Sequence, residues 1–205
     1  AIDEYTGSLK RLERANVGSM YTLNISCPNT FGGEPFTTPA RLEKLLHATD
    51  QMALSKPLFI KMPADQPWKE FRKLVEVASK HSVHGLTMTN LAKDRGAAKL
   101  KDFLPDDVAG NLSGMPTQSL SDELIRQTYL AYEGRFTIIG VGGIFSAADA
   151  YRKITYGANL VELITGMIFQ GPQLIGQINH DLVRYLKRDG LTNISQAVGI
   201  HAKKP

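Results

Sequence analysis

The only cysteine of the 205-residue chain, Cys27, lies between two asparagines, Asn24 and Asn29, directly after an apolar run. A free thiol has a pKa of about 8.5, so a site that favours the thiolate can use it as a base or nucleophile near neutral pH. Neighbouring amide side chains offer hydrogen-bond donors and acceptors without adding charge. Segment 24–30 therefore has the composition of a reaction site, although a lone cysteine at a strand end is more often a small buried apolar residue.

Other chemically useful residues follow four later apolar runs, at the point where each run ends. Taken singly, each has a structural explanation: Lys61 as a surface lysine, Asn90 as the polar end of a strand, and a Gly-Gly pair as a turn. Their joint placement at run ends favours a site. The residues concerned are Lys61, Thr89, Asn90, Gly142, Gly143, Thr165 and Gly166.

Short apolar runs alternate with amphipathic segments along the chain. Runs of this kind, rich in β-branched residues, are typical of strands buried on both faces. Their alternation with helical segments predicts an α/β fold with a parallel sheet. The five predicted strands lie at residues 21–27, 58–62, 85–90, 137–142 and 159–164.

The amphipathic segments predict the helices between these strands. Pro39 and Pro67 suit first-turn positions, where a missing N–H costs no hydrogen bond. Ser146, with Asp149 three residues later, fits a capping-box variant before a helix that Gly157 ends. The predicted helices lie at residues 2–15, 39–54, 68–78, 121–132, 150–156, 172–188 and 193–198.

An α/β series of this kind forms either an open, doubly wound sheet or part of an eight-stranded barrel. Two features favour the barrel. Polar residues or glycines end all five runs, where a barrel assembles its active site, and no G-x-G-x-x-G motif follows the first strand. Residues 91–118 are too long for a simple β-α loop, so we expect an insertion over the active site.

The composition is that of an ordinary globular chain, with 42% hydrophobic residues, 21% charged residues and a formal charge of +4. The basic residues are scattered, which argues against nucleic-acid binding. Neither the single cysteine nor the five histidines have ligand spacing, so no metal site is predicted. Cysteine usage fits a reducing cytoplasm. No apolar stretch reaches the roughly 20 residues that span a bilayer, and a start without methionine or signal peptide indicates a processed or truncated chain.

Six segments carry motifs that occur together, in this order, in one enzyme family. They are Asn-Ile-Ser-Cys-Pro-Asn-Thr at 24–30, Ile-Lys at 60–61, Thr-Asn at 89–90, Leu-Ser-Gly-Met-Pro at 112–116, Ile-Ile-Gly-Val-Gly-Gly-Ile at 138–144 and Gly-Pro at 171–172. With these motifs the chain closely resembles dihydroorotate dehydrogenase, nearly from end to end.

The resemblance implies that residues 1–205 are a single partial FMN-dependent domain, the carboxyl-terminal five β-α units of a TIM (β/α)8 barrel whose first three strands are missing. Five of eight strands cannot close a barrel, so the expected partner is the missing amino-terminal barrel half. In the quinone-linked class 2 branch of the family that region also touches the membrane. The expected location is therefore the cytoplasm, with membrane association through the missing region.

The resemblance also implies oxidation of dihydroorotate to orotate in the synthesis of the pyrimidine nucleotide UMP, with FMN as cofactor. A base removes a proton from C5 while a hydride leaves C6 for flavin N5, and Cys27 stands at the base position. Asn24, Asn29 and Asn90 would bind the pyrimidine ring. Leu91 stands where the family commonly has a hydroxyl residue that contacts the substrate, so we expect one hydrogen bond fewer.

The same matches assign the flavin contacts. Lys61 would stabilise negative charge that grows near flavin N1 and O2. Backbone N–H groups at Gly142 and Gly143, and at Thr165 and Gly166, would bind the FMN phosphate. The remaining expected flavin contacts are Asn24, Thr89, Gly114 and Ile164.

Two questions stay open from the sequence. The downstream motifs and the Ala-Val-Gly at 197–199 resemble class 2, but Cys27 is typical of class 1. The electron acceptor is therefore a quinone if the chain is of class 2, and fumarate or NAD if it is of class 1. The alternative functions are a non-catalytic fragment or remnant, or another FMN barrel acting on a pyrimidine. A relative of the dihydropyrimidine dehydrogenases would need an iron–sulfur or reductase partner, because this chain has no further cysteine ligands.

Overall fold

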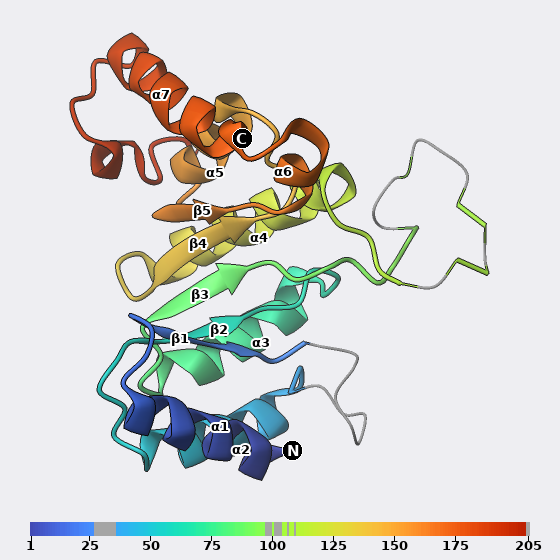
Figure 1. Ribbon diagram of the computed structural model, residues 1–205, viewed down its shortest axis with the longest axis vertical. Coiled ribbons are helices and arrows are strands. Elements are labelled where there is room, and N and C mark those ends of the chain that lie inside the picture. The colour runs from blue at the N-terminus through green and yellow to red at the C-terminus, as the bar shows by residue number, and fades with distance from the viewer. Residues whose placement is uncertain (27–35, 97–99, 101–103, 106, 109, 204–205) are drawn as a thin grey trace.

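The computed structural model describes residues 1–26, 36–96, 100, 104–105, 107–108 and 110–203. Within these ranges five strands form one sheet in the order β1-β2-β3-β4-β5, and all four pairings are parallel. Figure 1 shows the sheet with β1 and β5 as its outer strands. The strands are β1 (Tyr21–Asn24), β2 (Leu58–Lys61), β3 (Gly85–Met88), β4 (Thr137–Val141) and β5 (Leu160–Glu162).

The strand order follows the chain without a reversal. A doubly wound sheet reverses its order at a switch point, and helices then cover both faces. Here every crossover joins neighbouring strands, and right-handed crossovers of this kind place all helices on the same face. The predicted α/β architecture, with five consecutive β-α units of the barrel type, is confirmed.

The helix at residues 2–15 has the predicted ends, the other predicted helices differ at one or both ends, and two short elements, α6 and η1, were not predicted. The segment after β5 is split at Gly171, which has a φ of 89°, into the six-residue helix α6 and the longer α7. Six residues are too few to show a helical period in the sequence. The helices are α1 (Ile2–Ala15), α2 (Pro39–Asp50), α3 (Trp68–Ser79), α4 (Gln118–Tyr132), α5 (Ala147–Thr155), α6 (Thr165–Gln170) and α7 (Gln173–Arg188), with 3-10 helices η1 (Met115–Thr117) and η2 (Ile194–Ala197).

Helix starts follow the capping residues. Ser146 is the N-cap of α5 and accepts a hydrogen bond from the backbone N–H of Asp149 at 3.3 Å, so the helix starts three residues earlier than expected. The Asp149 carboxylate accepts from the N–H of Phe145 and the hydroxyl of Ser146 instead of the N–H of Ser146, so the reciprocal bond of the predicted capping box does not occur among the described residues. Pro39 is in the first turn of α2, as predicted. Pro67 is instead the N-cap of α3, one residue before its first turn.

The strands are shorter than the predicted runs, and they are not equally buried. Every residue of β3 is buried, as expected of a central parallel strand. In β5, Leu160 is 56% exposed and Glu162 is exposed as well, so the expectation of burial on both faces was wrong there. The reason is position, because no described strand pairs with the outer edge of β5.

His81, in the turn between α3 and β3, joins that turn to α2. Its Nδ1 lies 2.7 Å from Asp50 Oδ2, and its Nε2 lies 3.2 Å from Glu43 Oε1 in an ion-pair contact without hydrogen-bond alignment. Burial lowers the pKa of His81, but the hydrogen bond to Asp50 and the two carboxylate charges outweigh it and raise the pKa above the ordinary histidine value. The protonated form therefore stabilises this contact.

We expect the stabilisation from His81 to depend on pH. A histidine with a raised pKa in the folded state contributes fully below its unfolded pKa of about 6.5, and the contribution is lost as pH rises through the folded value. His81→Gln should therefore lower the thermal midpoint more at pH 6 than at pH 9, with a cost of about 1–2 kcal/mol at the lower pH. His180→Gln, whose side chain is 82% exposed, is the control. Equal losses at both pH values would contradict this assignment.

Candidate active site

A cavity with a volume of about 80 Å³ lies where β2, β3, β4 and β5 end. Parallel strands bring their carboxyl ends to one edge of the sheet, so the polar residues that follow the strands meet there. Ten residues predicted from the sequence line this cavity, although their individual roles stay predictions. They are Lys61, Thr89, Asn90, Leu91, Gly114, Gly142, Gly143, Ile164, Thr165 and Gly166.

The other three predicted residues are Asn24, Cys27 and Asn29. Cys27 and Asn29 lie outside the described residues. Asn24, the last residue of β1, is absent from the cavity lining and reaches the site through its hydrogen bond to Asn90.

Hydrogen bonds to backbone donors orient the amides of Asn24 and Asn90. Asn90 Oδ1 accepts from the N–H of Leu91 at 2.9 Å, and Asn90 Nδ2 donates to Asn24 Oδ1 at 2.8 Å and to Ser26 Oγ at 2.6 Å. Asn24 Oδ1 also accepts from the N–H of Ser26 at 3.4 Å. Both amide hydrogens of Asn90 are thereby used, while Asn24 Nδ2 has no hydrogen-bond partner among the described residues.

The charge in the cavity comes from one side chain. Lys61, at the end of β2, is the sole charged residue in the described lining. Its Nζ forms no hydrogen bond or ion pair with any described residue. This lysine has no carboxylate partner and lies at a mostly apolar cavity. It is therefore suited to bind a ligand that carries negative charge or develops it during a reaction.

Gly142 and Gly143 form the turn after β4, with φ values of 109° and 68° that favour glycine. The turn also packs closely on the junction of η1 and α4. A Cβ on Gly142 would lie 2.5 Å from Thr117 Oγ1, and one on Gly143 would lie 2.3 Å from Gln118 Cβ. Within the described structure, the N–H groups of Gly143 and Ile144 have no hydrogen-bond partner. Successive unpaired N–H groups of this kind form a binding site for an anion.

The second half of the predicted insertion at 91–118 contributes to the cavity. Ala92 and Leu112 form an antiparallel bridge with hydrogen bonds of 2.9 and 2.8 Å, which returns the chain to the site. Gly114 then packs on Thr165, since a Cβ there would lie 2.7 Å from Thr165 Cγ2. Sequence reasoning missed five lining residues. Four are next to predicted ones in the sequence, and Thr117 lies three residues after Gly114. The five are Ser113, Thr117, Val141, Ile144 and Leu163.

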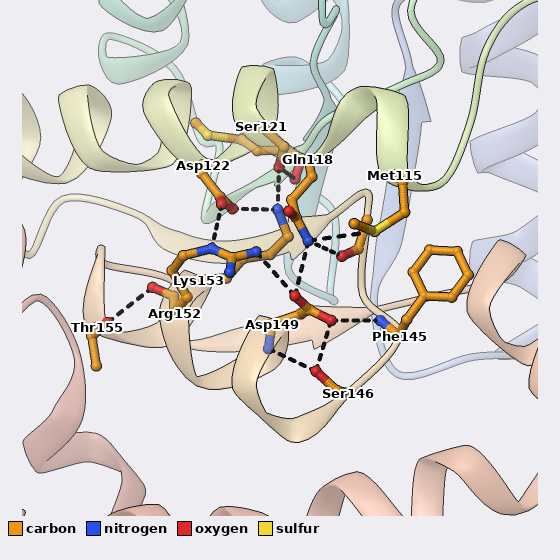
Figure 2. A network of polar contacts seen from close by, with 12 residues as sticks. Met115, Gln118, Ser121, Asp122, Phe145, Ser146, Asp149, Arg152, Lys153 and Thr155 are labelled. Carbon is orange, nitrogen blue, oxygen red and sulfur yellow. Dashed lines mark hydrogen bonds and ion pairs between the residues drawn. The ribbon is translucent and has the colours of Figure 1, made fainter. Parts of the chain in front are cut away.

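Behind the turn lies a polar network that the sequence analysis did not identify, shown in Figure 2. Lys153 of α5 is completely buried, and its Nζ lies 2.7 Å from Asp122 Oδ1 and 3.0 Å from Ser121 Oγ, both on α4. Burial lowers the pKa of Lys153, although the charge of Asp122 opposes the shift. Helical spacing was the available signal, because Lys153 lies three residues after buried Ala150.

Across the described ranges, no three His, Cys, Asp or Glu side chains gather where they could hold a metal ion. The groups available to a cofactor are therefore backbone N–H groups, amides, hydroxyls and Lys61. These suit an uncharged ring system that carries a phosphate.

Comparisons with known proteins agree with this arrangement. A family model described as dihydroorotate dehydrogenase matches residues 1–186. Relatives named dihydroorotate dehydrogenase (quinone) are 36% identical in Crocosphaera subtropica and 37% identical in Rippkaea orientalis, over 96% and 99% of this chain. The matches cover 53% and 55% of those relatives, so the chain spans about half the length of the curated relatives it matches.

Solved structures match the fold of this chain over its full length. The structure of ligand-free DHODH from Eimeria tenella is 26% identical, with a TM-score of 0.88 over 100% of this chain and 61% of that one. A second structure from that organism, in complex with ferulenol, has a TM-score of 0.85.

We expect Lys153→Met to destabilise the fold strongly, because it leaves Asp122 without the buried partner that lies 2.7 Å away. Removal of one member of a buried ion pair typically costs about 3–5 kcal/mol. Chemical denaturation measures this directly. Lys73→Met, whose side chain is 50% exposed and pairs with Glu70, should cost less than about 1 kcal/mol. If both variants lost a similar free energy of unfolding, the buried pair would stabilise the fold no more than an exposed pair does.

Proposed function

The chain belongs to the dihydroorotate dehydrogenase family, and on that premise we propose that it is the carboxyl-terminal portion of an enzyme that oxidises dihydroorotate to orotate in pyrimidine biosynthesis. The observation that carries the proposal is the cavity at the strand ends. It gathers ten residues predicted from separate motifs around Lys61, a lysine with no partner in the described structure.

We propose FMN as the cofactor, and the residues present fit it. The unpaired N–H groups of Gly143 and Ile144 support phosphate binding next to Gly142, with Thr165 and Gly166 on the facing turn. When bound, FMN accepts the hydride that leaves C6 of the substrate. Lys61 stabilises the negative charge that develops on the ring system. Thr89, Gly114 and Ile164, which line the cavity, would contact the ring, and Asn24, bonded to Asn90, is proposed as a further flavin contact.

The two oriented amides support recognition of a pyrimidine. Asn24 Nδ2 retains its donors for a ring carbonyl, whereas Asn90 offers the remaining lone pair of Oδ1 to a ring N–H. Leu91 provides apolar contact at the position where the family has a hydroxyl. Asn29 is proposed as a third amide contact. The pair thus matches alternating acceptor and donor groups without adding charge.

We assign the removal of the C5 proton to Cys27. The residue follows Ser26, whose hydroxyl accepts a hydrogen bond from Asn90 at 2.6 Å, so the backbone just before the thiol is tied to the substrate amides. A thiol needs less assistance than a hydroxyl to act as a base near neutral pH. Asn90, a proposed contact of the pyrimidine ring, is therefore bonded to the residue that precedes the proposed base.

For the electron acceptor we propose a quinone, because the similar relatives are named as quinone enzymes. No helix in the described part of the chain is long and apolar enough to cross a membrane. Any contact with a membrane is assigned to the part of the relatives that this chain does not cover.

The chain alone should bind FMN weakly and show no measurable oxidation of dihydroorotate, because the described residues supply five strands and a closed barrel of this type has eight. Quenching of flavin fluorescence measures binding, and reduction of a dye measures turnover. A yellow protein with one flavin per chain and full turnover would overturn this expectation.

Co-expression with the amino-terminal half of the Crocosphaera subtropica relative should restore flavin content and turnover together. Restored flavin content without turnover would instead favour a non-catalytic remnant.

In that assembly, Cys27→Ser should slow flavin reduction by dihydroorotate at neutral pH by about 100-fold, the lower range for loss of a general base. The pH dependence of the step should move upward, because a hydroxyl ionises at higher pH than a thiol. Stopped-flow measurements across pH test this, with Ser195→Ala in η2 as a control distant from the site. An unchanged pH profile would count against Cys27 as the base.

A further inference from the structure

Gln118, the first residue of α4, lies directly behind the cavity and is not part of its lining. Its Nε2 donates to the Gly143 carbonyl and, at 2.9 Å, to Asp149 Oδ1. Figure 2 shows the side chain reaching from α4 toward Asp149 and the residues after β4. Nε2 also lies 3.7 Å from Met115 Sδ, a weak acceptor. The two oxygen acceptors belong to the turn after β4 and to the first turn of α5, so Gln118 fixes that turn from outside the described lining.

Asp149 is held firmly enough to orient Gln118. Its Oδ1 accepts from Gln118 and from Arg152, while its Oδ2 accepts from Ser146 Oγ at 2.8 Å and from the N–H of Phe145 at 3.1 Å. A carboxylate has about four acceptor positions, and all are used. Burial raises the pKa of Asp149, but hydrogen bonds to the ionised form and the Arg152 charge outweigh it and lower the pKa below the ordinary value. The carboxylate therefore remains ionised near neutral pH.

The contact with the Gly143 carbonyl has a direct geometric consequence. In a trans peptide unit the C=O and the following N–H point in opposite directions, and the Gly143–Ile144 peptide is trans. A carbonyl held by Gln118 behind the turn therefore directs the N–H of Ile144 the other way, toward the cavity that Ile144 lines. That N–H has no partner in the described structure.

We propose that Gln118 is a positioning residue for a phosphate monoester, because it holds the Gly143–Ile144 peptide with its N–H directed into the cavity. The inference rests on the proposed function, in which this turn binds the phosphate of FMN. Gln118 would then strengthen the binding of a phosphorylated flavin relative to the same flavin without phosphate. Asp149 acts one step further away, by orienting the Gln118 amide.

The test compares FMN with riboflavin, which lacks the phosphate, on the 205-residue chain. Gln118→Leu keeps the side-chain size and removes the donors. It should weaken FMN binding about tenfold, which corresponds to about 1.4 kcal/mol, and leave riboflavin binding within about twofold. Gln127→Leu is the matched control, since Gln127 lies on the same helix and bonds to Glu123. Equal losses for both flavins, or no loss for FMN, would overturn the proposal.

Amide chemical shifts separate this inference from the proposed enzyme activity. In 1H–15N spectra, inorganic phosphate should shift the Gly143 and Ile144 amides of the unaltered chain and of Gln127→Leu, and shift them much less in Gln118→Leu. This outcome supports the inference even if no dihydroorotate oxidation is ever found. The role of Gln118 would be refuted if phosphate did not change these two amide chemical shifts in the unaltered chain. It would also be refuted if phosphate changed them equally in Gln118→Leu.

Discussion

Parallel pairing of all five strands is the constraint on which the site depends. Parallel strands bring every carboxyl end to the same edge, so residues far apart in sequence must meet there. Lys61 and Asn90 come from neighbouring strands, and Thr165 follows the outermost one. The same constraint leaves β1 and β5 with one described neighbour each, which explains the exposure of Leu160 at the edge of the sheet.

The second requirement is a fixed separation between α4 and the turn after β4. Gly142 and Gly143 permit a contact that any Cβ would prevent, and such a contact tolerates little movement of the helix. The buried pair of Lys153 and Asp122 joins α5 to α4 beneath this turn. Because buried charges interact strongly only at good geometry, the pair is better regarded as fixing the position of the helices than as a large net source of stability.

Two kinds of polar group therefore lie side by side at the strand ends. The amides of Asn24 and Asn90 are neutral and are oriented by backbone N–H groups, which suits a flat ring with alternating donors and acceptors. The turn at Gly143 offers backbone N–H groups to an anion, with Lys61 as the charged residue in the described lining. Each part is held by a residue outside the described lining, Ser26 for the first and Gln118 for the second.

The sequence by itself determined the α/β order, the helix faces and most of the residues that line the cavity, because apolar periodicity and strand-end positions are local properties of the chain. It also contained the motifs that identify the family. Only the tertiary structure decided which way the amides of Asn24 and Asn90 point, that Lys153 is buried, and that Gln118 holds Gly143. These depend on contacts between α4, α5 and the strand ends. Polar residues such as Gln118 and Lys153 look like ordinary helix-surface residues until the packing of the helices buries Lys153 completely and Gln118 in part.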